Sequence, residues 1–131
     1  MKTNQTENEI GQVVVDCAVR LHRELGPGLL ESVYEATLAR ALEKRGLATR
    51  RQIPIPIRFD GESFDEGFRA DLLVADRVLL ELKSVEKIAP VHKKQVLTYL
   101  RLGGFRLGFL LNFGSELMRD GIVRVINGRL E

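Results

Sequence analysis

Two acidic residues and a lysine lie close together in the middle of the chain, where their types suggest phosphate or metal chemistry. Asp71 lies in one apolar run, Glu81 and Lys83 lie in the next, and a short polar break at residues 75–77 separates the two runs. Such a break between apolar runs is typical of a hairpin turn. If residues 75–77 form the loop, Val74 pairs with Val78, and counting outward places Asp71 opposite Glu81.

Two carboxylates that face each other across a strand pair repel, because their Cβ atoms lie only about 5 Å apart. A divalent cation between Asp71 and Glu81 would remove this repulsion, and oxygen ligands suit Mg²⁺, Mn²⁺ or Ca²⁺. Two alternatives remain open at this point. A two-residue turn would place Asp71 opposite Leu82 and separate the acids, and a solvated strand face would carry only a Glu81–Lys83 ion pair.

Length and composition predict an ordinary globular protein. The 131 residues are expected to form one domain, residues 1–131, with 44% hydrophobic and 29% charged residues. The apolar runs are too short for a membrane span, and residues 1–9 contain no apolar signal core, so we expect a cytoplasmic protein. A single cysteine, Cys17, excludes an internal disulfide and a cysteine-based zinc site, and its place on an apolar stripe predicts that it is buried.

Two amphipathic helices are predicted in the first part of the chain. The spacing of Thr6 and Glu9 fits a capping box that starts the first helix, which the Gly-Pro-Gly at residues 26–28 must end. A second helix is predicted from about Leu29 to Arg45. Glu31 lies in its first turn, where it would either complement the helix dipole or point into a cleft. The residues expected to face inward from this second helix are Leu30, Val33, Tyr34, Leu38, Ala41 and Leu42.

The rest of the chain is predicted to form strands, with one helix between the third strand and the fourth. Pro54 and Pro56 lack the N–H groups that an interior strand needs, so the strand around them is expected at an edge of the sheet. The second strand is predicted from Phe64 to Val74 and the third from Val78 to Val85. A helix is then expected from Pro90 to the Gly-Gly at residues 103–104, with Val91, Val96, Leu97 and Leu100 inward, followed by strands over 107–112 and 121–127. This order predicts a mixed sheet flanked by helices, α/β in the loose sense and α+β by strict accounting.

Several motifs in this order resemble a known protein family. Residues 28–34, Gly-Leu-Leu-Glu-Ser-Val-Tyr, resemble the signature of the GxxExxY proteins, which are grouped in the PD-(D/E)XK nuclease superfamily. Asp71 and the Glu-Leu-Lys of residues 81–83 resemble the metal site of that superfamily, although Ala70 stands where its label has proline. Residues 95–99 are similar to a Gln-x-x-x-Tyr motif found on the helix that follows. The resemblance implies a restriction-endonuclease-like αβββαβ core, here with an extra N-terminal helix and a C-terminal strand.

The resemblance also implies roles for these residues. Asp71 and Glu81 would bind Mg²⁺ or Mn²⁺ with the main-chain carbonyl of Leu82, and Glu31 would add a carboxylate. Lys83 would orient the attacking water and steady the charge that develops on the phosphate. Gln95 and Tyr99, one helical turn apart, would line the cleft.

The two histidines of the chain are not expected to take part in catalysis, and its basic residues are candidates for phosphate contacts. His92 is expected at the surface rather than as a general base, and His22 is expected to be exposed. A net charge of +2 is too small to identify a nucleic-acid-binding protein. Local basic residues are candidates for phosphate contacts, although many such residues are merely solvated. These are Arg50, Arg51, Lys93, Lys94 and Arg101.

We therefore expect a Mg²⁺- or Mn²⁺-dependent nuclease that acts on DNA phosphodiesters, with a homodimer as its expected assembly. The first alternative is a catalytically silent nuclease fold that binds nucleic acid or protein. The second is a structural α/β protein whose acidic residues only form ion pairs.

Overall fold

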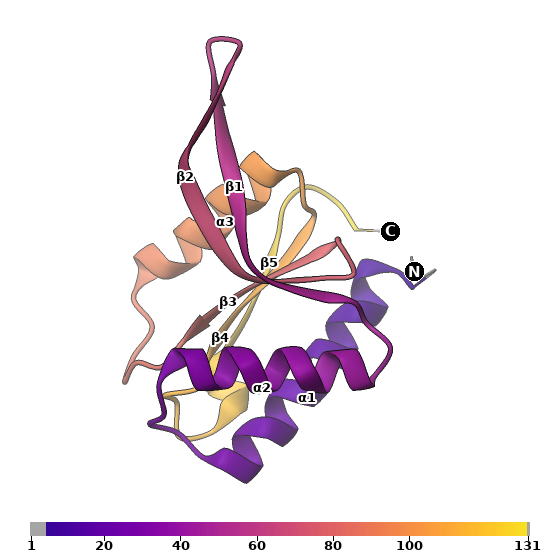
Figure 1. Cartoon of the computed structure of the whole chain (residues 1–131). Helices are drawn as coiled ribbons and strands as arrows, with labels where there is room; N and C mark the ends of the chain where they lie inside the picture. The colour runs from indigo at the N-terminus through magenta and orange to yellow at the C-terminus, as the bar shows by residue number, and fades with distance from the viewer. Residues whose placement is uncertain (1–4, 131) are drawn as a thin grey trace.

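The computed structural model describes residues 5–130, which form three α-helices, a short 3-10 helix and five strands (Figure 1). In chain order they are α1 (Glu7–Leu25), α2 (Glu31–Lys44), β1 (Thr49–Phe59), β2 (Glu62–Val74), β3 (Val78–Lys83), α3 (Pro90–Gly103), β4 (Leu107–Asn112), η1 (Met118–Gly121) and β5 (Ile122–Ile126). Within this range none of the helices combines the length and apolar character that crossing a membrane requires.

The strands form a single mixed sheet in the order β1-β2-β3-β4-β5. β3 and β4 run parallel, and every other neighbouring pair is antiparallel. Because parallel neighbours need a crossover connection, α3 joins β3 to β4 across one face of the sheet. The predicted αβββαβ core, with α1 before it and β5 after it, is confirmed, and the fold is α+β and restriction-endonuclease-like.

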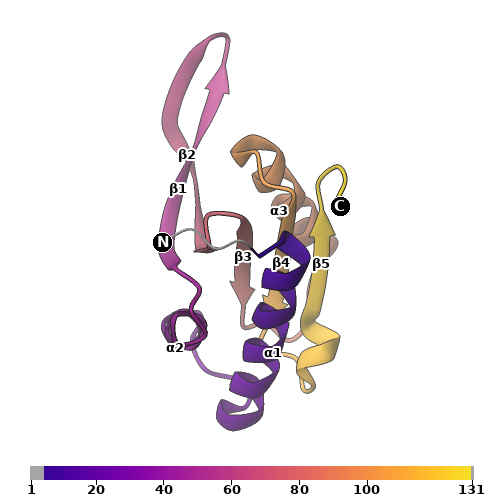
Figure 2. The same ribbon diagram turned by 90° about the vertical axis from the view of Figure 1, so that its right-hand side faces the viewer.

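The helices cover opposite faces of the sheet, as Figure 2 shows for α1 and α3 around β4. One apolar cluster joins α1 and α2 to the sheet through residues such as Leu72, Leu80 and Leu82. The other joins α3 to the sheet through Leu79 and Leu110. Side chains along a strand alternate between faces, so Glu81, two residues after Leu79, belongs to the α3 face.

Some expected core positions are wrong. Leu30 is 75% exposed, because it precedes the first turn of α2 in an extended conformation, and Val33 is 38% exposed beside a stripe that runs through Tyr34. Val91 is 62% exposed in the first turn of α3, before the helix reaches the sheet. His22 is buried rather than exposed, and its Nε2 lies 2.8 Å from the carbonyl oxygen of Ser115.

Other predictions from the sequence are confirmed. Cys17 is buried, and β1, which contains Pro54 and Pro56, is an edge strand. β1 and β2 form a long hairpin that projects from the body of the protein (Figure 1), and Asp60 and Gly61 supply its turn with positive φ angles.

The turn between β2 and β3 has the predicted register. Val74 pairs with Val78 and Leu72 with Leu80, so residues 75–77 are the loop and the two-residue alternative is wrong. The regular pairing ends at Leu72 and Leu80, one step before Asp71 and Glu81. The candidate site therefore begins where the ladder between β2 and β3 stops.

Candidate active site

Asp71 and Glu81 bind each other's strands through their side chains. The N–H of Asp71 donates to Oε1 of Glu81 at 3.2 Å, and the N–H of Leu82 donates to Oδ2 of Asp71 at 2.8 Å. The sequence predicts two side chains that face each other across a continued ladder. Instead, each carboxylate accepts a main-chain hydrogen bond from the opposite strand, because the strands separate here.

The environment of these two acids disfavours their negative charges. Glu81 is only 6% exposed, and its burial together with the charge of Asp71 raises its pKa to about 8. Burial also raises the pKa of Asp71, and the hydrogen bond from Leu82 partly opposes this shift. The solvated strand face with a Glu81–Lys83 ion pair is therefore wrong: Glu81 is buried, and residues 5–130 contain no such pair.

Glu31 reaches the same place from the first turn of α2. The N–H of Ser84, just after β3, donates to Oε2 of Glu31 at 3.3 Å, and the Ser84 hydroxyl donates to the Leu29 carbonyl at 2.6 Å. The charge of Glu31 contributes to the raised pKa values of both Asp71 and Glu81. Ser84 thus ties the start of α2 to the end of β3 and keeps the three carboxylates near one another.

The tyrosine of the 28–34 motif, Tyr34, stabilises the fold and does not line the site. The Tyr34 side chain is fully buried, its hydroxyl donates to the Gly26 carbonyl at 2.6 Å, and the N–H of Leu29 donates to that hydroxyl at 3.1 Å. Its ring stacks on Phe113 with centroids 4.4 Å apart. Gly28 has a φ of 96°, which favours glycine. In this motif glycine and tyrosine fix the turn that places Glu31.

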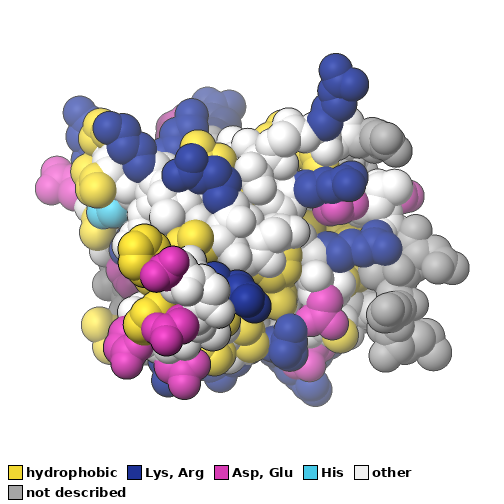
Figure 3. Space-filling view, turned by 90° about the horizontal axis from the view of Figure 1, so that it is seen from above, with side chains coloured by type: hydrophobic (Ala, Val, Ile, Leu, Met, Phe, Trp, Pro, Cys, Tyr) yellow, Lys and Arg dark blue, Asp and Glu magenta, His cyan; other side chains and the backbone are white. Residues whose placement is uncertain are grey.

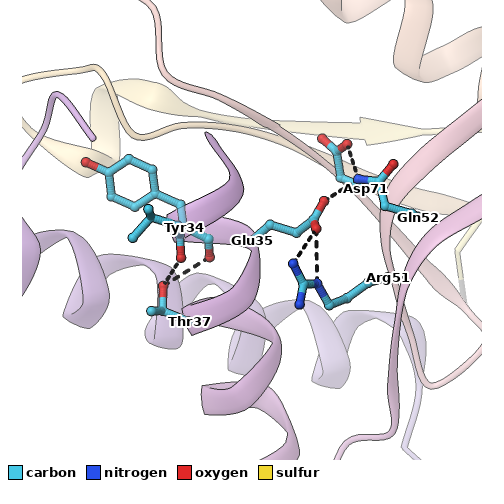
Figure 4. Close-up of polar contacts among 7 residues, drawn as sticks. Tyr34, Glu35, Thr37, Arg51, Gln52 and Asp71 are labelled. Atoms are coloured by element: carbon cyan, nitrogen blue, oxygen red, sulfur yellow. Dashed lines mark hydrogen bonds and ion pairs between the residues drawn. The ribbon is translucent and has the colours of Figure 1, made fainter. Parts of the chain in front are cut away.

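Sequence reasoning missed a fourth carboxylate, Glu35, which is 6% exposed. Arg51 donates to its Oε2 at 3.0 Å, and Nε2 of Gln52 donates to its Oε1 at 2.5 Å (Figure 4). The same Gln52 nitrogen lies 3.4 Å from Oδ1 of Asp71. Glu35 lies four residues after Glu31, and this helical spacing is the signal that could have found it.

A cavity of about 210 Å³ is lined by three of these carboxylates, those of Glu31, Glu35 and Asp71, whereas Glu81 is not among its lining residues. The cavity lies between the start of α2 and the strands β1, β2 and β3. Its lining residues are Glu31, Ser32, Glu35, Gln52, Asp71 and Leu82. Three of the six carry carboxylates. The charged side chains that line the cavity therefore all offer oxygen ligands to a cation.

Lys83 and Tyr99 lie beside the carboxylates. The half-buried Lys83 is the last residue of β3, and its charge partly offsets the raised pKa of Glu81. The Tyr99 ring stacks on Phe68 with centroids 3.6 Å apart, and burial together with the charges of Glu81 and Asp71 raises the pKa of its phenol. Gln95 is exposed on α3, and its side chain makes no hydrogen bond with the described part of the chain.

The donor set fits Mg²⁺ or Mn²⁺ by its chemistry, because carboxylate and carbonyl oxygens are the ligands that these hard cations prefer. Within residues 5–130, however, no three acidic, histidine or cysteine side chains converge tightly enough to hold an ion as they stand. One oxygen of Asp71 and one of Glu81 accept N–H donors from the main chain. Since each carboxylate oxygen has two acceptor sites, this leaves further positions for a cation.

The basic candidates fall into two groups. Arg50 and Arg51 are held in ion pairs, Arg50 with Asp76 at 2.6 Å and Arg51 with Glu35 at 3.0 Å. The others, Lys93, Lys94 and Arg101, are exposed on α3, and none of them forms an ion pair within residues 5–130. Figure 3 shows the protein from above, with the tip of the hairpin towards the viewer. Acidic and hydrophobic side chains gather at the lower left of this view, and basic side chains lie along its upper edge.

His92 and a hollow beside α1 are less suited to catalysis than the carboxylate site. Nδ1 of His92 accepts a hydrogen bond from the N–H of Ala89 at 3.1 Å, so this histidine caps the start of α3. A larger hollow of about 670 Å³ lies between α1 and the strands β4 and β5. Its one carboxylate, Asp16, is paired with Arg45 at 2.7 Å.

Comparison with known proteins agrees with this arrangement. A protein-family model described as the PD-(D/E)XK nuclease superfamily matches residues 8–125, which extend from most of α1 to most of β5. No curated protein and no solved structure gives a significant match to the chain. The matched range includes the carboxylates, Lys83 and the α3 residues described above, and the chain belongs to the PD-(D/E)XK nuclease superfamily.

Proposed function

We propose that this protein is a Mg²⁺- or Mn²⁺-dependent nuclease that hydrolyses DNA phosphodiester bonds. The observation that carries the proposal is the meeting of Asp71 and Glu81 at the end of the β2–β3 ladder, in surroundings that raise both pKa values. Buried carboxylates of like charge form a costly arrangement unless a proton or a cation neutralises them. Membership of a nuclease superfamily supports the same conclusion.

Each residue has a chemical role in this proposal. Asp71, Glu81 and the carbonyl of Leu82 would hold the cation, with Glu31 as a further ligand directly or through water. When bound, the cation would acidify a water molecule and offset charge on the phosphate. Lys83 would orient the attacking water and donate to the phosphate oxygen on which charge develops. Gln95 and Tyr99 would line the path of the substrate.

The remaining proposals concern family, domain, substrate and assembly. Residues 28–34 support assignment to the GxxExxY proteins within the superfamily, with residues 1–131 as one nuclease-like domain. The exposed lysines of α3 would contact the DNA backbone. A second copy of the chain would address the second strand of a duplex, and sedimentation at micromolar concentration tests this, since a monomer would contradict it.

A cleavage assay with purified variants tests the function. Plasmid, linear duplex and single-stranded DNA, and RNA of matched sequence, are incubated with Mg²⁺, Mn²⁺ or EDTA. We expect cleavage with metal only, loss of both cleavage and metal affinity in Asp71→Asn, and loss of cleavage with metal binding retained in Lys83→Ala. The loss for Lys83→Ala should be roughly a hundredfold or more.

Two matched controls separate these effects from a general change of charge. Asp65→Asn on the projecting hairpin and Lys44→Ala at the end of α2 alter exposed residues outside the site and should cleave as the wild type does. If Lys83→Ala cleaves as fast as Lys44→Ala, the proposed role of Lys83 is wrong.

One observation favours a second function. One oxygen of Asp71 and one of Glu81 accept main-chain N–H groups, and no three candidate ligands of the described chain converge on one point. These features fit a catalytically silent nuclease fold that binds nucleic acid or protein. Salt-sensitive DNA binding that EDTA leaves unchanged, without cleavage under any metal, would support this second function over the first.

A further inference from the structure

Gln52 has an unusual backbone conformation for its place in the sheet. Its φ is 51°, in the left-handed region that residues with a Cβ atom rarely adopt. The other non-glycine residues with positive φ between residues 5 and 130 are Asp60, Ala75 and Asp76, which lie in the two hairpin turns. Gln52 instead lies within strand β1, so no turn accounts for its conformation.

The hairpin changes face at this residue. Arg51 pairs with Leu72 and Ile53 with Ala70, and the step between them, Gln52 opposite Asp71, is missing from the regular pairing. Leu72 packs in the cluster beneath α1 and α2, whereas Ala70 packs in the cluster beneath α3. Residues two apart on a regular strand share a face, so β2 rolls over between them. Irregularities of this kind are enriched beside active sites, where they redirect a side chain.

The rolled strands bring the Gln52 amide between two carboxylates (Figure 4). Its Nε2 donates to Oε1 of Glu35 at 2.5 Å and lies 3.4 Å from Oδ1 of Asp71. The far oxygen of Glu35 is held by Arg51, and the far oxygen of Asp71 by the N–H of Leu82. A chain of alternating donors and acceptors therefore runs from Arg51 through Glu35 and Gln52 to Asp71.

We propose that Gln52 is a positioning residue that fixes the carboxylate of Asp71 for cation binding. An amide nitrogen has two N–H donors and no charge, so one group can bind both acids and separate their charges. The left-handed backbone is what aims this amide at them, and Glu35 with Arg51 anchors its other side. Such outer partners orient a metal ligand without touching the metal. The role in metal binding rests on the proposed function, but the bridge itself does not.

Two substitutions at Gln52 separate the backbone from the side chain. Gln52→Gly and Gln52→Ala both remove the amide, but only glycine accepts the left-handed conformation without strain. We expect both variants of the full-length protein to bind Mn²⁺ roughly tenfold or more weakly than wild type in calorimetric titration. Gln52→Gly should melt higher than Gln52→Ala, because both variants lose the amide but only alanine keeps the strain of the left-handed backbone. If Gln52→Gly binds Mn²⁺ as wild type does, the side chain positions nothing and the proposal is wrong.

A second measurement tests the bridge without metal. The Nε2 amide signals of Gln52 in the NMR spectrum of the metal-free protein should shift in Asp71→Asn and in Glu35→Gln, but not in the control Asp65→Asn. If wild type binds no Mn²⁺ and these shifts occur, the metal site fails while Gln52 still holds Asp71. If the signals do not respond to either substitution, the bridge is absent and the proposal is overturned whether or not metal binds.

Discussion

The N–H of Asp71 donates a 3.2 Å hydrogen bond to the side chain of Glu81, so one acidic residue of the pair binds the other through its main chain. This contact fixes the Glu81 carboxylate at a position that is only 6% exposed. It also places that carboxylate beside a second negative charge. The free energy of folding should therefore depend on whether Glu81 carries its proton.

The first prediction concerns stability against pH. The pKa of Glu81 is raised from 4.5 to about 8, so between these values the folded protein holds a proton that the unfolded chain releases. Stability must then fall as pH rises from about 5 to about 8, by at most about 1.4 kcal/mol for each pH unit in that range. We expect Glu81→Gln to remove most of this slope and to melt higher than wild type at about pH 9 in the presence of EDTA.

Thermal unfolding at a series of pH values measures this effect, and a glutamate elsewhere provides the control. Glu116→Gln changes an exposed residue after β4 and should leave the slope as it is in wild type. A slope that persists unchanged in Glu81→Gln would show that Glu81 does not titrate in this range.

The second prediction concerns competition between protons and metal, and it depends on the proposed function. A cation must displace the proton of Glu81, so Mn²⁺ affinity should rise as pH increases from about 6 to 8. The limit for one displaced proton is about tenfold per pH unit. Calorimetry in two buffers with different ionisation enthalpies counts the protons released. A pH-independent affinity with no proton release would contradict a site that contains Glu81.

The third prediction tests the structural role of Tyr34. Tyr34→Phe keeps the ring on Phe113 but removes the hydroxyl that pairs with the Gly26 carbonyl and the Leu29 N–H. Leaving such buried groups unpaired costs about 1–3 kcal/mol, which denaturant unfolding can measure. Tyr99→Phe is the matched control, because no hydrogen bond is formed by its hydroxyl within residues 5–130, and it should change stability by less than about 0.5 kcal/mol. Equal losses in both variants would contradict the role assigned to Tyr34.

Local patterns in the sequence predict the strands that carry the site and their register, but not the contacts of Gln52 and Glu35 within it. The polar break at residues 75–77 was enough to predict that Val74 pairs with Val78, because turn length sets register. Strand alternation could not predict that β2 rolls over at Asp71, since that change depends on the left-handed Gln52 and its partner Glu35 from α2. These contacts join residues distant in sequence.

The lysines of α3 give the last prediction, on DNA affinity. Lys93 and Lys94 are exposed in the first turns of a helix that begins at Pro90, where the helix dipole also attracts phosphate. Replacing both with glutamine should weaken DNA binding and reduce the salt dependence of log K by about one for each phosphate that the lysines no longer neutralise. Arg50→Gln should have a smaller effect, because Arg50 must first leave Asp76, to which it is bound at 2.6 Å. Fluorescence anisotropy across a series of salt concentrations measures both slopes, and an unchanged slope in the double lysine variant would place the DNA on another surface.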